Sequence, residues 1–329
     1  MLENKSILIT GGTGTLGKAL TKHIFNKFPS VKKVIIFSRD EQKQHQMALD
    51  YPEKEYPNIR FFIGDVRDKD RLVRAFKGVD YVIHAAAMKH VHIAEYNPDE
   101  CIKTNIGGAQ NVVHASIESN IQKVVALSTD KASSPINLYG ATKLTSDKLF
   151  IAANKIKGSS KTIFSVVRYG NVMGSNGSVI PFFKKISRSG YFPITHPKMT
   201  RFNISIQEGV ELVMFALEHA IGGELFVPKI PSYKILDVAK AINPDCEIKI
   251  IGIRPGEKLH EEMISSSDSI STYDIGDKYV ILPHQYNYLN DFIRLHQAKK
   301  VNENFSYESN NNEHWEDVES LKLKINNLD

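Results

Sequence analysis

Near its N-terminus the chain reads Ile7-Leu8-Ile9-Thr10-Gly11-Gly12-Thr13-Gly14-Thr15-Leu16-Gly17. In this stretch an apolar run passes into three glycines that are each separated by two residues. Such glycines permit a tight turn, let the backbone approach a pyrophosphate, and let a strand and a helix pack closely. The helix that follows offers free N–H groups and a partial positive charge to phosphates. Because the motif joins a predicted strand to a predicted helix, it indicates a dinucleotide-binding Rossmann fold.

Outward from this motif, short apolar runs alternate with helix-length segments. Strands are expected at residues 6–10, 34–38, 60–63, 81–85, 124–128 and 162–168, and helices at 18–27, 68–76, 105–119 and 139–155. A repeated strand-then-helix order is typical of a parallel sheet with helices on both faces. The predicted fold class is therefore α/β, a doubly wound Rossmann sheet with a smaller C-terminal substrate-binding lobe.

The end of the second expected strand bears on the choice of cofactor. Ser38 and Arg39 suit a 2′-phosphate, which a guanidinium grips with paired donors, whereas an acidic residue here would bind the ribose hydroxyls of NAD. Asp40 lies close by, and a solvated arginine at a strand end is the alternative for Arg39, but NADP is favoured. The expected cofactor-binding residues are Gly11, Thr13, Gly14, Thr15, Leu16, Gly17, Ser38, Arg39, Lys43, Asp65, Val66, Ala85, Ala86, Lys89, Ser128, Tyr139 and Lys143.

The regular pattern ends at Gly174, and prolines then divide a region of shorter elements. We expect residues 1–174 to form the NADP-binding Rossmann domain, to which an amphipathic helix in 205–226 returns. Residues 175–204 and 227–283 are expected to form the substrate-binding lobe. Residues 284–329 turn polar and are expected to form a tail that is either mobile or packed on a partner subunit.

Composition limits the classes of function. The 329 residues carry a formal charge of +5, from 42 basic and 37 acidic side chains, which is too weak an excess to predict a nucleic-acid partner. No run approaches the roughly 20 apolar residues that span a bilayer, and the N-terminus lacks a signal-peptide pattern. A cytoplasmic location is therefore expected by elimination. The two cysteines, Cys101 and Cys246, lack the spacing of a disulfide framework or of a metal site.

Tyr139 and Lys143 are expected on one face of a helix, because they stand four positions apart. A tyrosine hydroxyl has an unperturbed pKa near 10 and exchanges protons poorly at neutral pH. A nearby ammonium and a positive nicotinamide ring would favour the phenolate. Tyr139 is therefore a plausible base that removes an alcohol proton as hydride leaves, with Lys143 holding the nicotinamide ribose.

The segment Ser128-Thr129-Asp130-Lys131 follows the fifth expected strand. Residues at the carboxyl end of a parallel strand border the active-site crevice. Asp130 and Lys131 either form a surface ion pair of little consequence or serve a dehydratase as acid and base. Lys131 would need its pKa lowered from about 10.4 to act as that base.

At these residues the chain resembles the extended short-chain dehydrogenases, and more closely the UDP-N-acetylglucosamine 4,6-dehydratases that invert C5. The resemblance covers about the first 285 residues. It is carried by residues 11–17, 85–90, 128–132, 137–143, 168–172 and 254–261, of which Thr129-Asp130-Lys131 is the most specific segment. Related glucose dehydratases typically have glutamate in place of Lys131, and retaining relatives commonly have methionine in place of Tyr139.

The resemblance implies a lyase with tightly held NADP and with UDP-N-acetylglucosamine as its substrate. Tyr139 would take the 4-hydroxyl proton while hydride passes from C4 to NADP⁺. Lys131 would then remove the C5 proton while Asp130 protonates the departing 6-hydroxyl. Return of hydride to C6 and of a proton to the opposite face of C5 gives UDP-2-acetamido-2,6-dideoxy-β-L-arabino-hex-4-ulose, an early intermediate toward pseudaminic acid.

The resemblance also suggests substrate contacts and an assembly. The expected substrate-binding residues are Lys89, Asn171, Arg201, Arg254 and Glu257, and a solvated surface charge is the alternative for each arginine. Relatives form multimers, so a homo-oligomer is expected, and no metal is expected. Two rival functions stay open: a UDP-sugar 4-epimerase, which has no need of Asp130 and Lys131, and a non-catalytic protein that binds NADP as a sensor or scaffold.

Overall fold

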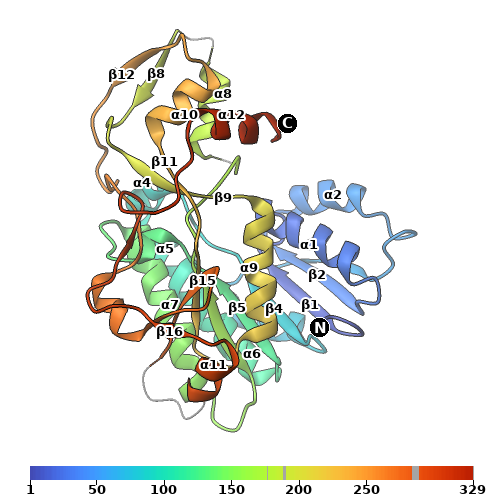
Figure 1. Cartoon of the computed structure of the whole chain (residues 1–329). Coiled ribbons are helices and arrows are strands. Elements are labelled where there is room, and N and C mark those ends of the chain that lie inside the picture. Colours follow the sequence, from blue (N-terminus) through green and yellow to red (C-terminus); the bar gives the residue numbers. More distant parts are fainter. Residues whose placement is uncertain (176, 188–189, 284–288, 329) are drawn as a thin grey trace.

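The computed structural model describes residues 1–175, 177–187, 190–283 and 289–328. It contains a large α/β domain and a smaller lobe beside one end of that domain, which is drawn uppermost in Figure 1. The lobe carries strands β8 and β12 and helices α8 and α10, and the C-terminal helix α12 lies against it.

The main sheet has ten strands within the described residues, in the order β16-β14-β15-β10-β6-β5-β4-β1-β2-β3. Neighbours are parallel from β3 to β10 and antiparallel from β10 to β16. The strands are β1 (Ser6–Thr10), β2 (Lys33–Ser38), β3 (Ile59–Ile63), β4 (Tyr81–His84), β5 (Lys123–Leu127), β6 (Ile163–Val167), β10 (Leu225–Pro228), β14 (Thr272–Asp274), β15 (Lys278–Ile281) and β16 (Lys299–Lys300).

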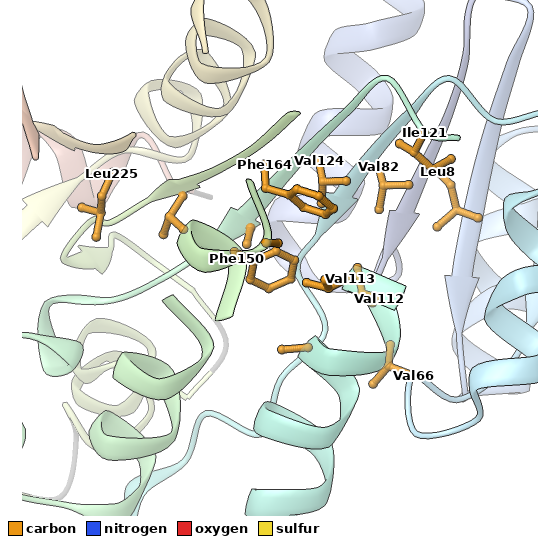
Figure 2. Close-up of a cluster of buried hydrophobic side chains, with 14 of the residues drawn as sticks. Leu8, Val66, Val82, Val112, Val113, Ile121, Val124, Phe150, Phe164 and Leu225 are labelled. Carbon is orange, nitrogen blue, oxygen red and sulfur yellow. The ribbon is translucent and has the colours of Figure 1, made fainter. Parts of the chain in front are cut away.

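Helices cover both faces of this sheet because its central strands are apolar on both sides. One face carries α3 (Lys69–Phe76), α6 (Gly108–Glu118) and α7 (Leu138–Ile156), and the other carries α1 (Thr15–Lys27), α2 (Glu41–Asp50), α9 (Ile206–His219) and α11 (Leu289–Leu295). Figure 2 shows Phe150 and Phe164 packed with Val82 and Val124 in the first of these layers. Burial of each such phenylalanine stabilises the fold by about 1.5–3 kcal/mol.

The lobe has its own apolar core, which includes Phe183, Phe192 and Val238. Its elements and the short segments around the site are α4 (Val91–Tyr96), α5 (Pro98–Ile102), β7 (Asn171–Val172), α8 (Val179–Ile186), β8 (Tyr191–Ile194), β9 (Thr200–Ile204), β11 (Ser232–Lys234), α10 (Ile235–Ile242), β12 (Glu247–Ile250), β13 (Glu262–Ile264), β17 (Tyr307–Glu308) and α12 (Val318–Asn326).

The predicted doubly wound α/β fold is confirmed. Each of the six expected strands forms within about two residues of its expected bounds, and β1 has the expected bounds. The amphipathic helix expected after Ser205 is α9, which begins with a capping box between Ser205 and Glu208. It packs on the main domain against α1, β5 and β6.

Two segments lie elsewhere than expected. Residues 272–281, expected in the lobe, form β14 and β15 at the edge of the main sheet, because Val280 and Tyr273 add to its apolar core. Residues 289–328, expected as a mobile or partner-bound tail, pack on this same chain through apolar side chains spaced among polar ones, such as Phe292 and Leu321. The other residues assigned to that tail, 284–288 and 329, lie outside the described residues.

Candidate active site

A cavity of about 840 Å³ runs along the carboxyl ends of the parallel strands and reaches the lobe. Every expected cofactor residue except Asp65 lines it. In doubly wound sheets, ligands bind in the crevice outside the carboxyl ends of the strands. The cavity is therefore the candidate active site.

The glycine loop is shaped to admit a phosphate group. Gly11 has a φ of +66°, and a Cβ on it would stand 2.8 Å from the backbone nitrogen of Ala86. A Cβ on Gly17 would stand 2.4 Å from the carbonyl oxygen of Gly12, so α1 meets β1 too closely for any side chain there. No side chain caps the N-terminus of α1 at Gly14. This loop fits the pyrophosphate of a dinucleotide, whose oxygens can accept from the free N–H groups of α1.

Ser38, Arg39 and Lys43 gather at the end of β2 and line the cavity. Arg39 is exposed and lies 3.6 Å from the carboxylate of Asp65. Asp65 itself is held by a 2.7 Å ion pair with Arg67. Asp65 is not part of the cavity lining and its carboxylate faces two arginines, whereas its neighbour Val66 lines the cavity; a cofactor contact of Asp65 stays a prediction.

Asp130 and Lys131 lie in a 3₁₀ turn (Asp130–Ala132) directly after β5. The Asp130 carboxylate is fully buried, and its Oδ1 accepts from Thr129 Oγ1 at 2.9 Å and from Lys131 Nζ at 3.0 Å. Burial raises the pKa of the Asp130 carboxyl, and the Lys131 ammonium offsets this only in part. The turn therefore favours a protonated Asp130, the form that an acid requires.

Lys131 is held between two carboxylates, since its Nζ also lies 2.9 Å from Oε1 of the buried Glu261. Burial alone would lower the pKa of Lys131, but the negative charges of Asp130 and Glu261 outweigh it and raise that pKa. The lowered pKa that Lys131 would need as a base is therefore not present in this arrangement. The reason is Glu261, a second carboxylate that enters from a distant part of the sequence.

The side chains of Tyr139 and Lys143 both extend from α7 and line the cavity. The helix begins at the N-cap Asn137, whose side chain accepts from the backbone of Gly140 at 2.7 Å. Burial raises the pKa of Tyr139 to about 12, against the lowering effects of Lys131 and of a hydrogen bond with Thr129. Burial also lowers the pKa of Lys143. In this state the phenol is protonated, so further positive charge is needed to produce a phenolate.

A buried polar network supports this wall of the site. Asp147 accepts from Ser128 Oγ at 2.7 Å and forms a 3.1 Å ion pair with Arg168. Its charge favours the ammonium of Lys143, one helical turn earlier. Arg168 also donates to the Met263 carbonyl at 2.8 Å, which links α7 to β13. Buried hydrogen-bonded pairs of this kind fix side-chain positions.

The expected substrate residues divide into two groups. Lys89, Asn171, Arg201 and Glu257 line the cavity. Arg254 is exposed, pairs with Glu257 at 3.7 Å, and is not part of the lining.

Arg201 is neither a solvated surface charge nor a free phosphate ligand. It is buried, donates to the carbonyls of Thr200 at 2.7 Å and Leu259 at 3.2 Å, and faces Glu261 at 3.5 Å. Its guanidinium is therefore already engaged on several sides. Asn171 has a hydrogen bond with Tyr233 of β11.

Sequence reasoning missed Glu261 and Asp147. Glu261 is the last residue of the segment 254–261 that carried the family resemblance, and that position was the available signal. Asp147 lies four residues after Lys143, on the same face of α7.

The fold and the site together define an extended short-chain dehydrogenase: a Rossmann sheet, a glycine loop at its first helix, and a tyrosine and lysine facing the same crevice. More particularly, the chain belongs to the polysaccharide biosynthesis protein family, whose model matches residues 7–283.

Three relatives illustrate this membership. The chain is 54% identical to the UDP-N-acetylglucosamine 4,6-dehydratase (inverting) of Campylobacter jejuni subsp. jejuni serotype O:2, over 100% of this chain and 99% of the relative. It is 39% identical to the UDP-glucose 4-epimerase of Rickettsia canadensis, over 99% and 97% of the two chains. The solved structure of Pen from Bacillus thuringiensis superposes with a TM-score of 0.89 at 38% identity, covering 100% and 98% of the two chains.

Of the helices within the described residues, none combines the length and the apolar character that a bilayer crossing requires.

Proposed function

We propose that this chain is an NADP-dependent UDP-N-acetylglucosamine 4,6-dehydratase that inverts C5. The observation that carries the proposal is a buried acid, Asp130, hydrogen-bonded to the amine of Lys131, which lines the same cavity as Tyr139 and Lys143. A relative named for this activity is 54% identical over its whole length.

The residues present fit a nicotinamide dinucleotide. Its pyrophosphate would lie on the loop from Gly11 to Gly17, and Lys143 would hold the nicotinamide ribose from α7. Such a cofactor would supply a site that takes up hydride from C4 of the sugar and gives it back at C6, without net consumption.

The residues of the chain supply the proton transfers. Tyr139 would accept the 4-hydroxyl proton once the positive charge of a bound nicotinamide, added to that of Lys131, offsets the rise in pKa that burial causes. The resulting 4-ketone acidifies the C5 proton. Neutral Lys131 accepts that proton while the C–H electrons form a C5–C6 double bond, and Asp130 protonates the 6-hydroxyl, which leaves as water. Burial favours the protonated form of Asp130 that this step needs.

The preference for NADP rests on the cluster Ser38, Arg39 and Lys43. A 2′-phosphate at the end of β2 would accept charge-assisted hydrogen bonds from Arg39 and Lys43. Each of these cations has an acidic neighbour, Asp65 and Asp40 respectively, so the phosphate would compete with a weak surface pair.

A UDP-sugar 4-epimerase is the second candidate, because relatives from Rickettsia carry that name. Epimerisation needs Tyr139 and the cofactor but gives no role to the buried pair Asp130 and Lys131. Mass spectrometry of the product from UDP-N-acetylglucosamine separates the two. The dehydratase product is lighter by one water, whereas an unchanged mass with an altered C4 would support the epimerase. No turnover of any UDP-hexosamine would favour a protein that binds NADP without catalysis.

We place the enzyme in the cytoplasm as a homo-oligomer, at an early step toward pseudaminic acid for surface glycans. Size-exclusion chromatography with light scattering tests the assembly, and the accumulation of UDP-N-acetylglucosamine after gene deletion tests the pathway.

A further inference from the structure

Two consecutive carboxylates hold the catalytic turn from different sides. Glu261 contacts the Lys131 ammonium at 2.9 Å, whereas Glu262 accepts from the hydroxyl groups of Ser133 at 2.9 Å and Ser134 at 2.5 Å. In the same segment, Lys258 donates to the Ser133 carbonyl at 2.7 Å. Residues 258–262 therefore fix both the backbone of the turn and the side chain of its lysine.

Glu261 is itself held through its backbone and through Oε1 of its carboxylate. Its backbone N–H donates to Ser309 Oγ at 2.9 Å, and the Ser309 N–H donates back to the Glu261 carbonyl at 2.8 Å. Its Oε1 lies 3.5 Å from Nε of Arg201, which is buried and bonded to two carbonyls. Its Oε2 is buried and has no hydrogen-bond partner among the described residues. The carboxylate thus has little freedom to leave Lys131.

The elimination step has a strict proton requirement. Before the step, Lys131 must be a neutral amine and Asp130 a neutral carboxylic acid. The pair then holds one titratable proton, which lies on Asp130. The ion pair of Lys131 ammonium and Asp130 carboxylate holds the same number of protons. Transfer along the 3.0 Å Lys131–Asp130 hydrogen bond converts one form into the other without exchange with solvent.

We propose that Glu261 is a positioning residue of this step: through its ion pair it holds the Lys131 side chain against Asp130 and keeps one proton on that pair. The inference rests on the dehydratase activity proposed above. In this role Glu261 acts on the reaction through its contact with Lys131, and Arg201 contacts Glu261 from the other side.

The electrostatics of the surroundings agree with this role. The negative charge of Glu261 raises the pKa of both Asp130 and Lys131, and Arg201 opposes it at Lys131. The titratable and charged groups that face the pair are Glu261 before β13, Arg201 on β9, Tyr233 on β11 and Tyr139 on α7. Of these, Glu261 is the carboxylate in direct contact with Lys131 from outside the turn.

The test is the pH dependence of kcat/KM for water loss from UDP-N-acetylglucosamine by the NADP-loaded enzyme. Glu261→Gln removes the negative charge, so the pKa values of the pair fall and both limbs of the profile move to lower pH. A charge within about 4–6 Å shifts a pKa by about 1–3 units, and a shift of that size is expected. Glu261→Asp keeps the charge and should retain the wild-type limbs.

Two further variants control for folding and for damage to the turn. Glu262→Gln loosens the same turn without changing a charge beside Lys131, so its limbs should stay at the wild-type pH. Arg201→Gln removes the cation that lowers the pKa of Lys131, so the limb of the profile that Lys131 sets should move to higher pH. This variant also reports on the network if Glu261→Gln does not fold. Superposition of the Glu261→Gln profile on the wild-type profile, or an unmoved profile in Arg201→Gln, would overturn the inference. Absence of water loss with the wild-type enzyme would instead reject the proposed function.

Discussion

The carbonyl oxygen of Lys131 lies directly against Gly140, so closely that a Cβ on Gly140 would stand 2.2 Å from it. Helix α7, which carries Tyr139, can approach the turn that carries Lys131 only because residue 140 has no side chain. The distance between Tyr139 on α7 and Lys131 on the turn therefore depends on the glycine at position 140.

Gly140→Ala should therefore push α7 away from the turn and separate Tyr139 from Lys131. Because a displacement of about 1 Å can cost about 10²-fold in rate, we expect kcat to fall by about that factor. Gly107→Ala is the matched control, since a Cβ there meets nothing within 4 Å and its φ of −59° suits any residue. Equal rates for the two variants would contradict the spacing role of Gly140.

Tyr139→Phe should remove the base for the 4-hydroxyl while leaving the cavity shape intact. Loss of a positioned acid–base group costs about 10²–10⁴-fold, so kcat should fall by that range. NADP binding, measured by isothermal titration calorimetry, should change little. A variant with near wild-type turnover would show that another group takes the proton.

Arg39→Ala should weaken the binding of NADP more than that of NAD. Loss of a hydrogen bond from a charged donor costs about 1.5–3 kcal/mol, or about 10- to 100-fold in Kd. Affinity for NAD, which lacks the 2′-phosphate, serves as the internal control in the same titration. An equal loss for both cofactors would place Arg39 away from the 2′-phosphate.

Phe292→Ala should destabilise the whole protein, because Phe292 is 1% exposed and packs on the sheet beneath α11. We expect a loss of about 3–5 kcal/mol in the free energy of unfolding, measured by chemical denaturation. Leu295→Ala is the control on the same helix, since Leu295 is 70% exposed and its loss should cost under about 0.5 kcal/mol. If both variants unfold alike, α11 does not belong to the core.

The fold could be predicted well because its signals are local. The strand and glycine loop from Ser6 to Gly17 lie within one short segment, and hydrophobic periodicity places the later elements. The C-terminal segment could not be predicted in this way. Phe292 and Leu321 are isolated among polar residues, and only the tertiary structure shows that they reach two different cores.

In the candidate site, too, the features that depend on local sequence could be predicted and those that depend on tertiary contacts could not. Residues at the ends of expected strands, such as Lys131 and Ser38, could be placed at the crevice from strand order alone. The partner of Lys131 could not, because Glu261 meets it through a contact between distant segments. For that reason the raised pKa of Lys131 could not be predicted, although the position of Lys131 at the crevice could.

Proton NMR of the product formed from UDP-N-acetylglucosamine in D₂O tests the central role of Asp130 and Lys131 most directly. The account predicts a 4-keto, 6-deoxy sugar with deuterium at C5 and the coupling pattern of the L configuration, and no such product from Lys131→Ala with NADP still bound. Protium retained at C5, or full turnover by Lys131→Ala, would contradict it.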